Sequence, residues 1–205
     1  MNTPGSPWDV VSAAAGPRPP ALAATPESGI IGAPMPIRPI VKYGEAVLHT
    51  PALRVARIDD AVQALFEDMV ATMYAAPGIG LAAPQIGVGL RVIVIDLSVG
   101  EDQARLIRLV NPEIVEREGE QKHEEGCLSI PGYAGSPARP ARVVVRGLDP
   151  EGKERVHEAT ELLARAFCHE IDHIDGLLFV DRLSPLKRDL TKRKLRKRVR
   201  EGWED

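Results

Sequence analysis

The spacing of apolar residues predicts two amphipathic helices in the middle and later parts of the chain. Across residues 59–74 the apolar positions recur every three or four residues, as they do along one face of a helix. Pro77 and Gly78 follow this segment and are expected to end the helix. A second helix is predicted across residues 160–174, with Thr160 as a candidate N-cap and a glycine just beyond its end.

Strands are predicted where β-branched and aliphatic residues run together, at 91–97, 106–110, 142–148 and 154–159. The last two runs flank Asp149-Pro150-Glu151-Gly152, whose residue types suit a type I turn, so they are expected to form a hairpin. Strands gather ahead of the second helix instead of alternating with helices. The predicted class is therefore α+β, with mainly antiparallel sheets around a central helix and a basic helix at the C-terminus.

Composition divides the chain into an extension and one domain. Residues 1–36 hold eight of the 18 prolines and few large apolar groups, which predicts a disordered extension. Residues 37–205 are expected to form a single domain. Within it, residues 184–202 form the basic C-terminal helix.

The sequence predicts a cytoplasmic protein without a membrane span. No apolar run approaches the roughly 18–20 residues that cross a bilayer, and Arg18 is the only basic residue among the first 37. Cys127 and Cys168 are the two cysteines. A disulfide is one interpretation, but without an export signal thiol or thiolate chemistry is favoured.

The strongest local motif is His169-Glu170-Ile171-Asp172-His173. Two histidines four residues apart project from one helix face and can reach one cation, and Glu170 beside them can exchange a proton with a metal-bound water. A patch of surface residues is the alternative. The motif needs a third ligand, but two known metallopeptidase patterns are not completed downstream, because position 179 is Phe and the next glutamate is Glu201. Cys127 is the remaining soft ligand.

Two upstream segments carry further signals. Glu125-Gly126-Cys127-Leu128-Ser129 places a cysteine after a glycine, which by itself is also typical of a small buried residue. Residues 78–85 read GIGLAAPQ, which alone could form a plain turn between a helix and a strand.

In their content and order, the three motifs resemble those of peptide deformylases, across roughly residues 37–185. The resemblance implies that Cys127, His169 and His173 hold a metal with water as fourth ligand. It implies Fe(II) as the usual cation, with zinc, nickel or cobalt able to occupy the site. One departure is Cys168, where the family usually has Gln.

The resemblance also implies the reaction: hydrolysis of the N-formyl group from the formyl-methionine of nascent polypeptides, with metal-bound water as nucleophile. Glu170 would be general base and acid, and the Gln85 side chain and the Leu128 backbone N–H would stabilise the oxyanion. Further residues are expected to contact the substrate: Gly78, Ile79, Gly80, Leu128, Leu162, Ala166 and Phe167.

The C-terminal segment carries a strong local charge. Between Arg182 and Arg200 there are ten Lys or Arg residues and one acid, whereas the whole chain has a net charge of −3. A solvated helix is one interpretation; the resemblance implies transient contact with the ribosome, with no role in binding DNA. Two rival functions stay open: another HExxH metallopeptidase that cleaves internal bonds, and a catalytically inactive relative that binds ribosomes.

Overall fold

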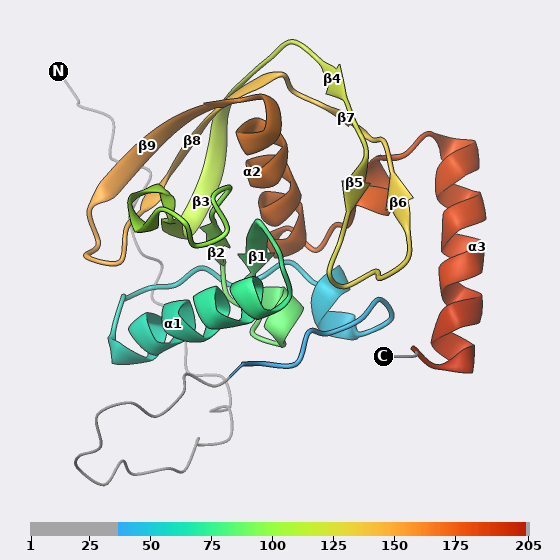
Figure 1. The fold of residues 1–205 in the computed structure, drawn as a ribbon, viewed down its shortest axis with the longest axis horizontal. Helices are drawn as coiled ribbons and strands as arrows, with labels where there is room; N and C mark the ends of the chain where they lie inside the picture. Colours follow the sequence, from blue (N-terminus) through green and yellow to red (C-terminus); the bar gives the residue numbers. More distant parts are fainter. Residues whose placement is uncertain (1–36, 204–205) are drawn as a thin grey trace, which may run out of the picture. The chain divides into compact units, whose positions relative to one another are not determined.

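The computed structural model describes residues 37–203 (Figure 1). The extension predicted at 1–36 lies outside the described residues. The described residues contain three α-helices: α1 (Asp60–Ala75), α2 (Glu161–Ile174) and α3 (Pro185–Glu201). They also contain four short 3-10 helices: η1 (Ala46–His49), η2 (Ala83–Ile86), η3 (Gln103–Arg105) and η4 (Phe179–Arg182).

The strands form one five-stranded sheet and two small ribbons. The large sheet has the order β1-β2-β3-β8-β9, and every neighbouring pair is antiparallel. Its strands are β1 (Gly80–Ala82), β2 (Val92–Ile95), β3 (Ile107–Glu118), β8 (Arg142–Leu148) and β9 (Glu154–Thr160). The ribbons pair β4 (Gln121–Lys122) with β7 (Ala138–Arg139), and β5 (Glu125–Gly126) with β6 (Ala134–Gly135). The predicted α+β class with antiparallel sheet is confirmed.

The large sheet is buried on both faces at β2, which explains the unbroken apolar run in this strand. Side chains alternate across a strand. Ile93 and Ile95 pack in a cluster with Phe167 of α2, whereas Val92 and Val94 pack in another cluster with residues of α1. Because both faces of β2 are covered by a helix, every position of the strand favours an apolar residue.

Both α2 and the β8–β9 hairpin form where the sequence predicted them. In the hairpin the Gly152 N–H donates to the Asp149 carbonyl at 2.9 Å, which closes the predicted turn. Thr160 stands at the N-cap of α2, but its side chain makes no capping hydrogen bond. Beyond the helix, Gly176 has φ +74°, and a Cβ there would lie 2.9 Å from backbone atoms of residues 50 and 51. A glycine is therefore required where α2 turns back against this segment.

Two parts of the fold differ from the sequence prediction. β3 continues to Glu118 instead of ending at Val110, because its pairing with β8 resumes after a register shift between Val110 and Glu113. The shift accommodates Asn111-Pro112, which interrupts the regular ladder without ending the strand. β1 was not predicted, since residues 78–85 were interpreted as a turn; the segment is a short strand followed by η2.

The basic helix α3 packs on the domain through a small third cluster. Leu195 is its only residue classed as buried, and it contacts a cluster that includes Ile130, Phe179 and Leu183. Cys127 is partly buried against the same cluster. Within residues 37–203, none of the helices has both the length and the hydropathy of a membrane span.

Candidate active site

Three potential metal ligands converge between α2 and the loop that follows β5. One ligand atom each from Cys127, His169 and His173 lies within 4.8 Å of the others. The Cys127 Sγ is 3.3 Å from the His173 Nε2. The histidines meet because they are four residues apart on one helix, whereas the cysteine is more than 40 residues away in sequence and reaches them through β5–β6.

The donor set fits a divalent cation of borderline softness. A thiolate with two imidazoles is a three-ligand set that leaves a position for water or substrate. The pKa of His173 is held well below its ordinary value, mainly by burial, so that its imidazole is neutral, the form that binds metals. His169 donates through Nδ1 to the Glu125 carboxylate at 3.2 Å, which directs its Nε2 toward the other two ligands.

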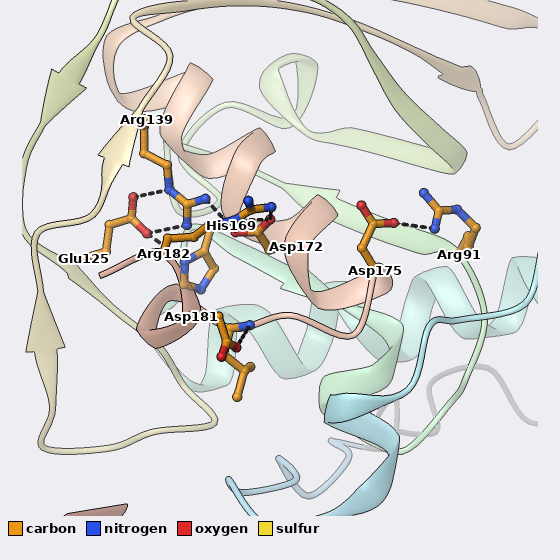
Figure 2. A network of polar contacts seen from close by, with 9 residues as sticks. Arg91, Glu125, Arg139, His169, Asp172, Asp175, Asp181 and Arg182 are labelled. Carbon is orange, nitrogen blue, oxygen red and sulfur yellow. Dashed lines mark hydrogen bonds and ion pairs between the residues drawn. The ribbon is translucent and has the colours of Figure 1, made fainter. Parts of the chain in front are cut away.

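The Glu125 carboxylate belongs to a largely buried ion-pair network that reaches His169 (Figure 2). Arg139 binds Glu125 with two hydrogen bonds of 2.9 Å and reaches Asp172 of α2 at 2.6 Å. Arg182 of η4 binds the same Asp172, also at 2.6 Å. Burial raises the pKa of Glu125, but hydrogen bonds with His169 and Arg139 outweigh it and lower the pKa from 4.5 to about 2. Glu125 and Arg139 thus form a buried pair, and Asp172 links Arg139 to Arg182.

Glu170 lies beside the ligand cluster with its carboxylate buried. Burial raises its pKa to about 7, and its Oε2 has no hydrogen-bond partner among the described residues. A Cβ on Gly80 would overlap this carboxylate, so that glycine is needed to admit the Glu170 side chain. At Gly78 an added Cβ would lie 3.0 Å from the Leu128 side chain. The two glycines therefore make room for site side chains, in addition to any contact with substrate.

Gln85 is held in one orientation at the end of η2. Its Oε1 accepts a hydrogen bond of 2.8 Å from the Ala82 N–H, so its amide nitrogen points toward the cluster. That nitrogen lies 3.7 Å from the Cys127 Sγ and 3.4 Å from the Ser129 Oγ. The Leu128 N–H donates to no acceptor within residues 37–203. Two donors are therefore available beside the ligands.

The site opens into a cavity of about 440 Å³. Its lining contains the following residues expected to contact substrate: Gly78, Ile79, Gly80, Leu128, Leu162 and Ala166. The structure does not place Phe167 on this wall. Phe167 is fully buried against the sheet, because it occupies the face of α2 opposite to the cavity.

Several residues of the site were not found from sequence. Phe179 stacks on His169 with ring centroids 6.5 Å apart, and Arg182 completes the ion-pair network. Arg165 and Tyr133 line the cavity. Arg182 and Phe179 lie in η4, just after α2. A single arginine and a single aromatic residue form no periodic pattern or motif that would have pointed to the site. Cys168 is a free cysteine buried in the core, beside the site and outside the cavity lining.

The fold and site together define a class of protein. An antiparallel sheet packs between two helices, and one of them, α2, joins Cys127 of the loop after β5 in a Cys/His/His cluster with a buried carboxylate beside an open cavity. These are the features of an α+β metalloenzyme with a hydrolytic type of site.

The comparison with known proteins is more specific. The sequence model of the polypeptide deformylase family matches residues 37–189. A peptide deformylase of Acidobacterium capsulatum is 51% identical over 168 residues, which cover 82% of this chain and 99% of that relative. One of Thermodesulfovibrio yellowstonii is 52% identical over 162 residues, covering 79% and 98%. The chain belongs to the polypeptide deformylase family.

Solved structures agree with this assignment. The crystal structure of a peptide deformylase from Legionella pneumophila has a TM-score of 0.74 and 46% identity, covering 82% of this chain and 100% of that one. A peptide deformylase from Synechococcus elongatus, solved in complex with actinonin, has a TM-score of 0.73 and 43% identity, with coverages of 79% and 89%.

Proposed function

We propose that this protein hydrolyses the N-formyl group from the formyl-methionine that begins nascent polypeptides, releasing formate and a free amine. The observation that carries the proposal is the convergence of Cys127, His169 and His173 beside Glu170 at the end of a cavity. Membership of the deformylase family supports it. We place the reaction in the cytoplasm, where such chains are made.

We propose Fe(II) as the bound cation, as the resemblance to peptide deformylases implies, with zinc, nickel or cobalt as alternatives that the same ligands can hold. A divalent cation held there would supply a Lewis acid for the formyl group and would lower the pKa of a coordinated water. Cys127, His169 and His173 would hold it. Glu125 and Arg139 would keep the His169 ring in its ligating orientation through the hydrogen bond to Nδ1.

Glu170 is the proton carrier of the proposed mechanism. A carboxyl group with a pKa raised to about 7 can accept a proton and return it near neutral pH. It takes the proton from the water that attacks the formyl carbon. It then delivers the proton to the amine as the carbon–nitrogen bond breaks.

The Gln85 amide and the Leu128 N–H stabilise the negative charge that develops on the formyl oxygen. Because the Ala82 N–H fixes the Gln85 amide in advance, this donor needs no reorganisation during the reaction. We expect Gln85→Leu to lower kcat by a factor of about 10²–10³, the effect of losing one oxyanion donor. Steady-state kinetics check this, and an unchanged kcat would remove Gln85 from the mechanism.

The substrate peptide is expected to enter along β1. This strand is at one edge of the sheet, so its outer side can pair with an extended peptide. The cavity walls formed by Ile79, Leu128, Leu162 and Ala166 would receive the methionine side chain. Phe167 acts only indirectly, by fixing α2 against the sheet.

One assay separates this function from its rivals. The Fe(II)-loaded protein, kept anaerobic, is incubated with formyl-Met-Ala-Ser, and formate and peptide fragments are measured. A deformylase releases formate and leaves the peptide bonds intact. Cleavage of internal bonds would indicate an endopeptidase, and no product would indicate an inactive relative.

A transient ribosome contact through α3 is the proposed partner interaction. Arg193, Lys194 and Arg196 are exposed, whereas Leu195 between them is buried and holds the helix on the domain. Replacing the three basic residues with Gln should weaken co-sedimentation with ribosomes, most clearly at low salt, and leave formyl-peptide turnover unchanged. Replacing exposed Lys122 and Lys153 with Gln is the matched control. Equal co-sedimentation of both variants would argue against α3.

A further inference from the structure

Lys42 is a half-buried lysine whose side chain reaches the loop that follows β5. Its Nζ donates to the Leu128 carbonyl at 3.2 Å. Among the described residues no backbone N–H donates to that carbonyl, so the lysine supplies a hydrogen bond that the backbone does not. Lys42 does not line the cavity. Its contact with the site is therefore indirect, through Leu128, one of the two proposed oxyanion donors.

The loop that carries Leu128 is not part of a long strand ladder. β5 and β6, on either side of it, pair with each other over two residues each. The direction of the Leu128 N–H depends on the peptide plane that it shares with the Cys127 carbonyl, because the peptide unit is planar. That carbonyl accepts a hydrogen bond of 2.9 Å from the Ile130 N–H. Lys42 holds the next plane, which carries the Leu128 carbonyl, so the planes on both sides of the Leu128 Cα are held.

The backbone on either side of this lysine is itself fixed. The Val41 N–H donates to the Gln85 carbonyl at 2.8 Å. The Tyr43 N–H donates to the Ser129 carbonyl at 2.8 Å, and the Tyr43 carbonyl accepts a hydrogen bond of 3.1 Å from the Trp203 Nε1–H. A supporting side chain orients a functional group well only when its own position is fixed by further contacts, and these hydrogen bonds provide them.

We propose that Lys42 is a positioning residue for deformylation, which orients the Leu128 N–H toward the formyl oxygen through its hydrogen bond to the Leu128 carbonyl. This inference rests on the proposed deformylase function. The negative charge on the formyl oxygen develops only as the transition state is approached, so a well-aligned donor acts mainly there. Loss of Lys42 should therefore lower kcat with little change in KM.

The test compares Lys42→Met, Lys42→Arg and a matched control, Lys153→Met. Methionine removes the donor, whereas arginine keeps a charged donor on a long side chain. Lys153 is exposed in the β8–β9 turn and does not line the cavity. Each variant is made in the wild-type chain and in Gln85→Leu, and is assayed with formyl-Met-Ala-Ser as the metal-loaded full chain. Bound metal and circular dichroism are measured as well, and Lys42→Gln replaces Lys42→Met if the methionine variant does not fold.

We expect Lys42→Met to lower kcat about tenfold, because a misaligned oxyanion donor costs less than a missing one. KM should stay within about twofold of the wild-type value, and bound metal should be unchanged. Lys42→Arg should recover most of the lost kcat. The loss should persist in the Gln85→Leu background, because the Leu128 N–H still donates to the same oxygen there.

Three results would overturn the role of Lys42 and leave the proposed function intact. The first is a kcat of Lys42→Met equal to that of Lys153→Met. The second is a loss of bound metal in proportion to the loss of kcat, which would place the effect at Cys127. The third is a loss of kcat that vanishes in the Gln85→Leu background, which would place the effect at Gln85.

Failure of the proposed function itself gives a different result. A metal-loaded wild-type protein that releases no formate from formyl-Met-Ala-Ser would refute that function, and the role of Lys42 with it.

Discussion

Helices α2 and α3 have similar lengths, but α2 lies in the interior of the domain and α3 lies on its surface (Figure 1). Nine of the 14 residues of α2 are buried, including Glu170, Asp172 and His173. One of the 17 residues of α3 is buried, Leu195, and its many basic side chains lie at the surface. The buried charge of Asp172 in α2 is paired with arginines, whereas the basic side chains of α3 are in contact with water.

The contacts that hold each helix follow from this difference. Asp172 of α2, with a side chain 6% exposed, is bound by two arginines from other elements. Lys192 of α3 binds Asp181 at 2.6 Å, but the two side chains are 33% and 21% exposed. A buried charge that loses its partner is strongly destabilising, and an exposed one is screened by solvent. The same chemical change should therefore have very different effects in the two helices.

The largest difference is expected for a carboxylate of each helix. Glu170→Gln keeps the shape of the side chain but removes the proton acceptor, so kcat should fall by a factor of about 10²–10⁴. Glu201→Gln at the end of α3 should leave kcat within about twofold. Kinetics with formyl-Met-Ala-Ser measure both, and bound metal is quantified to show that the site of Glu170→Gln is still loaded. Comparable turnover of the two variants would contradict the role of Glu170.

A smaller difference is expected between removing an arginine from the buried network and removing one from the surface of α3. Arg139→Met leaves Glu125 and Asp172 buried with fewer partners, and should lower the free energy of unfolding by about 3–5 kcal/mol. Arg193→Met on α3 should change it by less than about 0.5 kcal/mol. Urea unfolding monitored by circular dichroism checks both values. Equal stabilities would mean that the network contributes no more than a surface charge.

The buried network should also make stability depend on acid. The pKa of Glu125 is lowered from 4.5 to about 2, so its contribution is fully present above about pH 4.5 and is lost as the pH falls toward 2. In this range His169 is protonated in the folded and the unfolded chain, since its folded pKa is raised. Between pH 5 and pH 3 the free energy of unfolding should therefore fall less in Glu125→Gln than in the wild type, by on the order of 3 kcal/mol at most. Chelator-treated proteins are compared, so that release of metal does not contribute. A parallel slope in both proteins would count against the lowered pKa.

The smallest effect is expected at the contact that anchors α3. Lys192→Met removes its ion pair with Asp181 and should cost less than about 1 kcal/mol. Hydrogen exchange should become faster in the amides of α3 and stay unchanged in α2, because the terminal helix opens locally. Faster exchange throughout the domain would show that α3 is more closely integrated than its exposure indicates.

Much of the fold was predictable because its signals are local. The period of residues 59–74 gave α1, and the turn at residues 149–152 gave the β8–β9 hairpin. β1 was missed because a strand of three residues that begins with a glycine is too short to show a pattern. β3 was predicted too short because Asn111-Pro112 is typical of a break, whereas pairing with β8 carries the strand past it.

The candidate site divides in the same way. Helical spacing identified His169, Glu170 and His173 as neighbours, since residues four apart share a helix face. Phe167 was expected to contact the substrate, but helical periodicity gives only the direction of a side chain around the helix axis. It does not tell whether a sheet or a cavity lies opposite, and for Phe167 it is the sheet.

The sequence by itself determined the helices, the hairpin, the metal-binding residue types and the family, because these depend on neighbours along the chain or on short motifs. Only the tertiary structure decided that Cys127 meets the histidines, that Gly80 admits Glu170, and that Arg139 binds both Glu125 and Asp172. The physical reason is that burial and pairing depend on contacts between segments far apart in sequence. No local pattern records whether a charge will find an opposite charge when the chain folds.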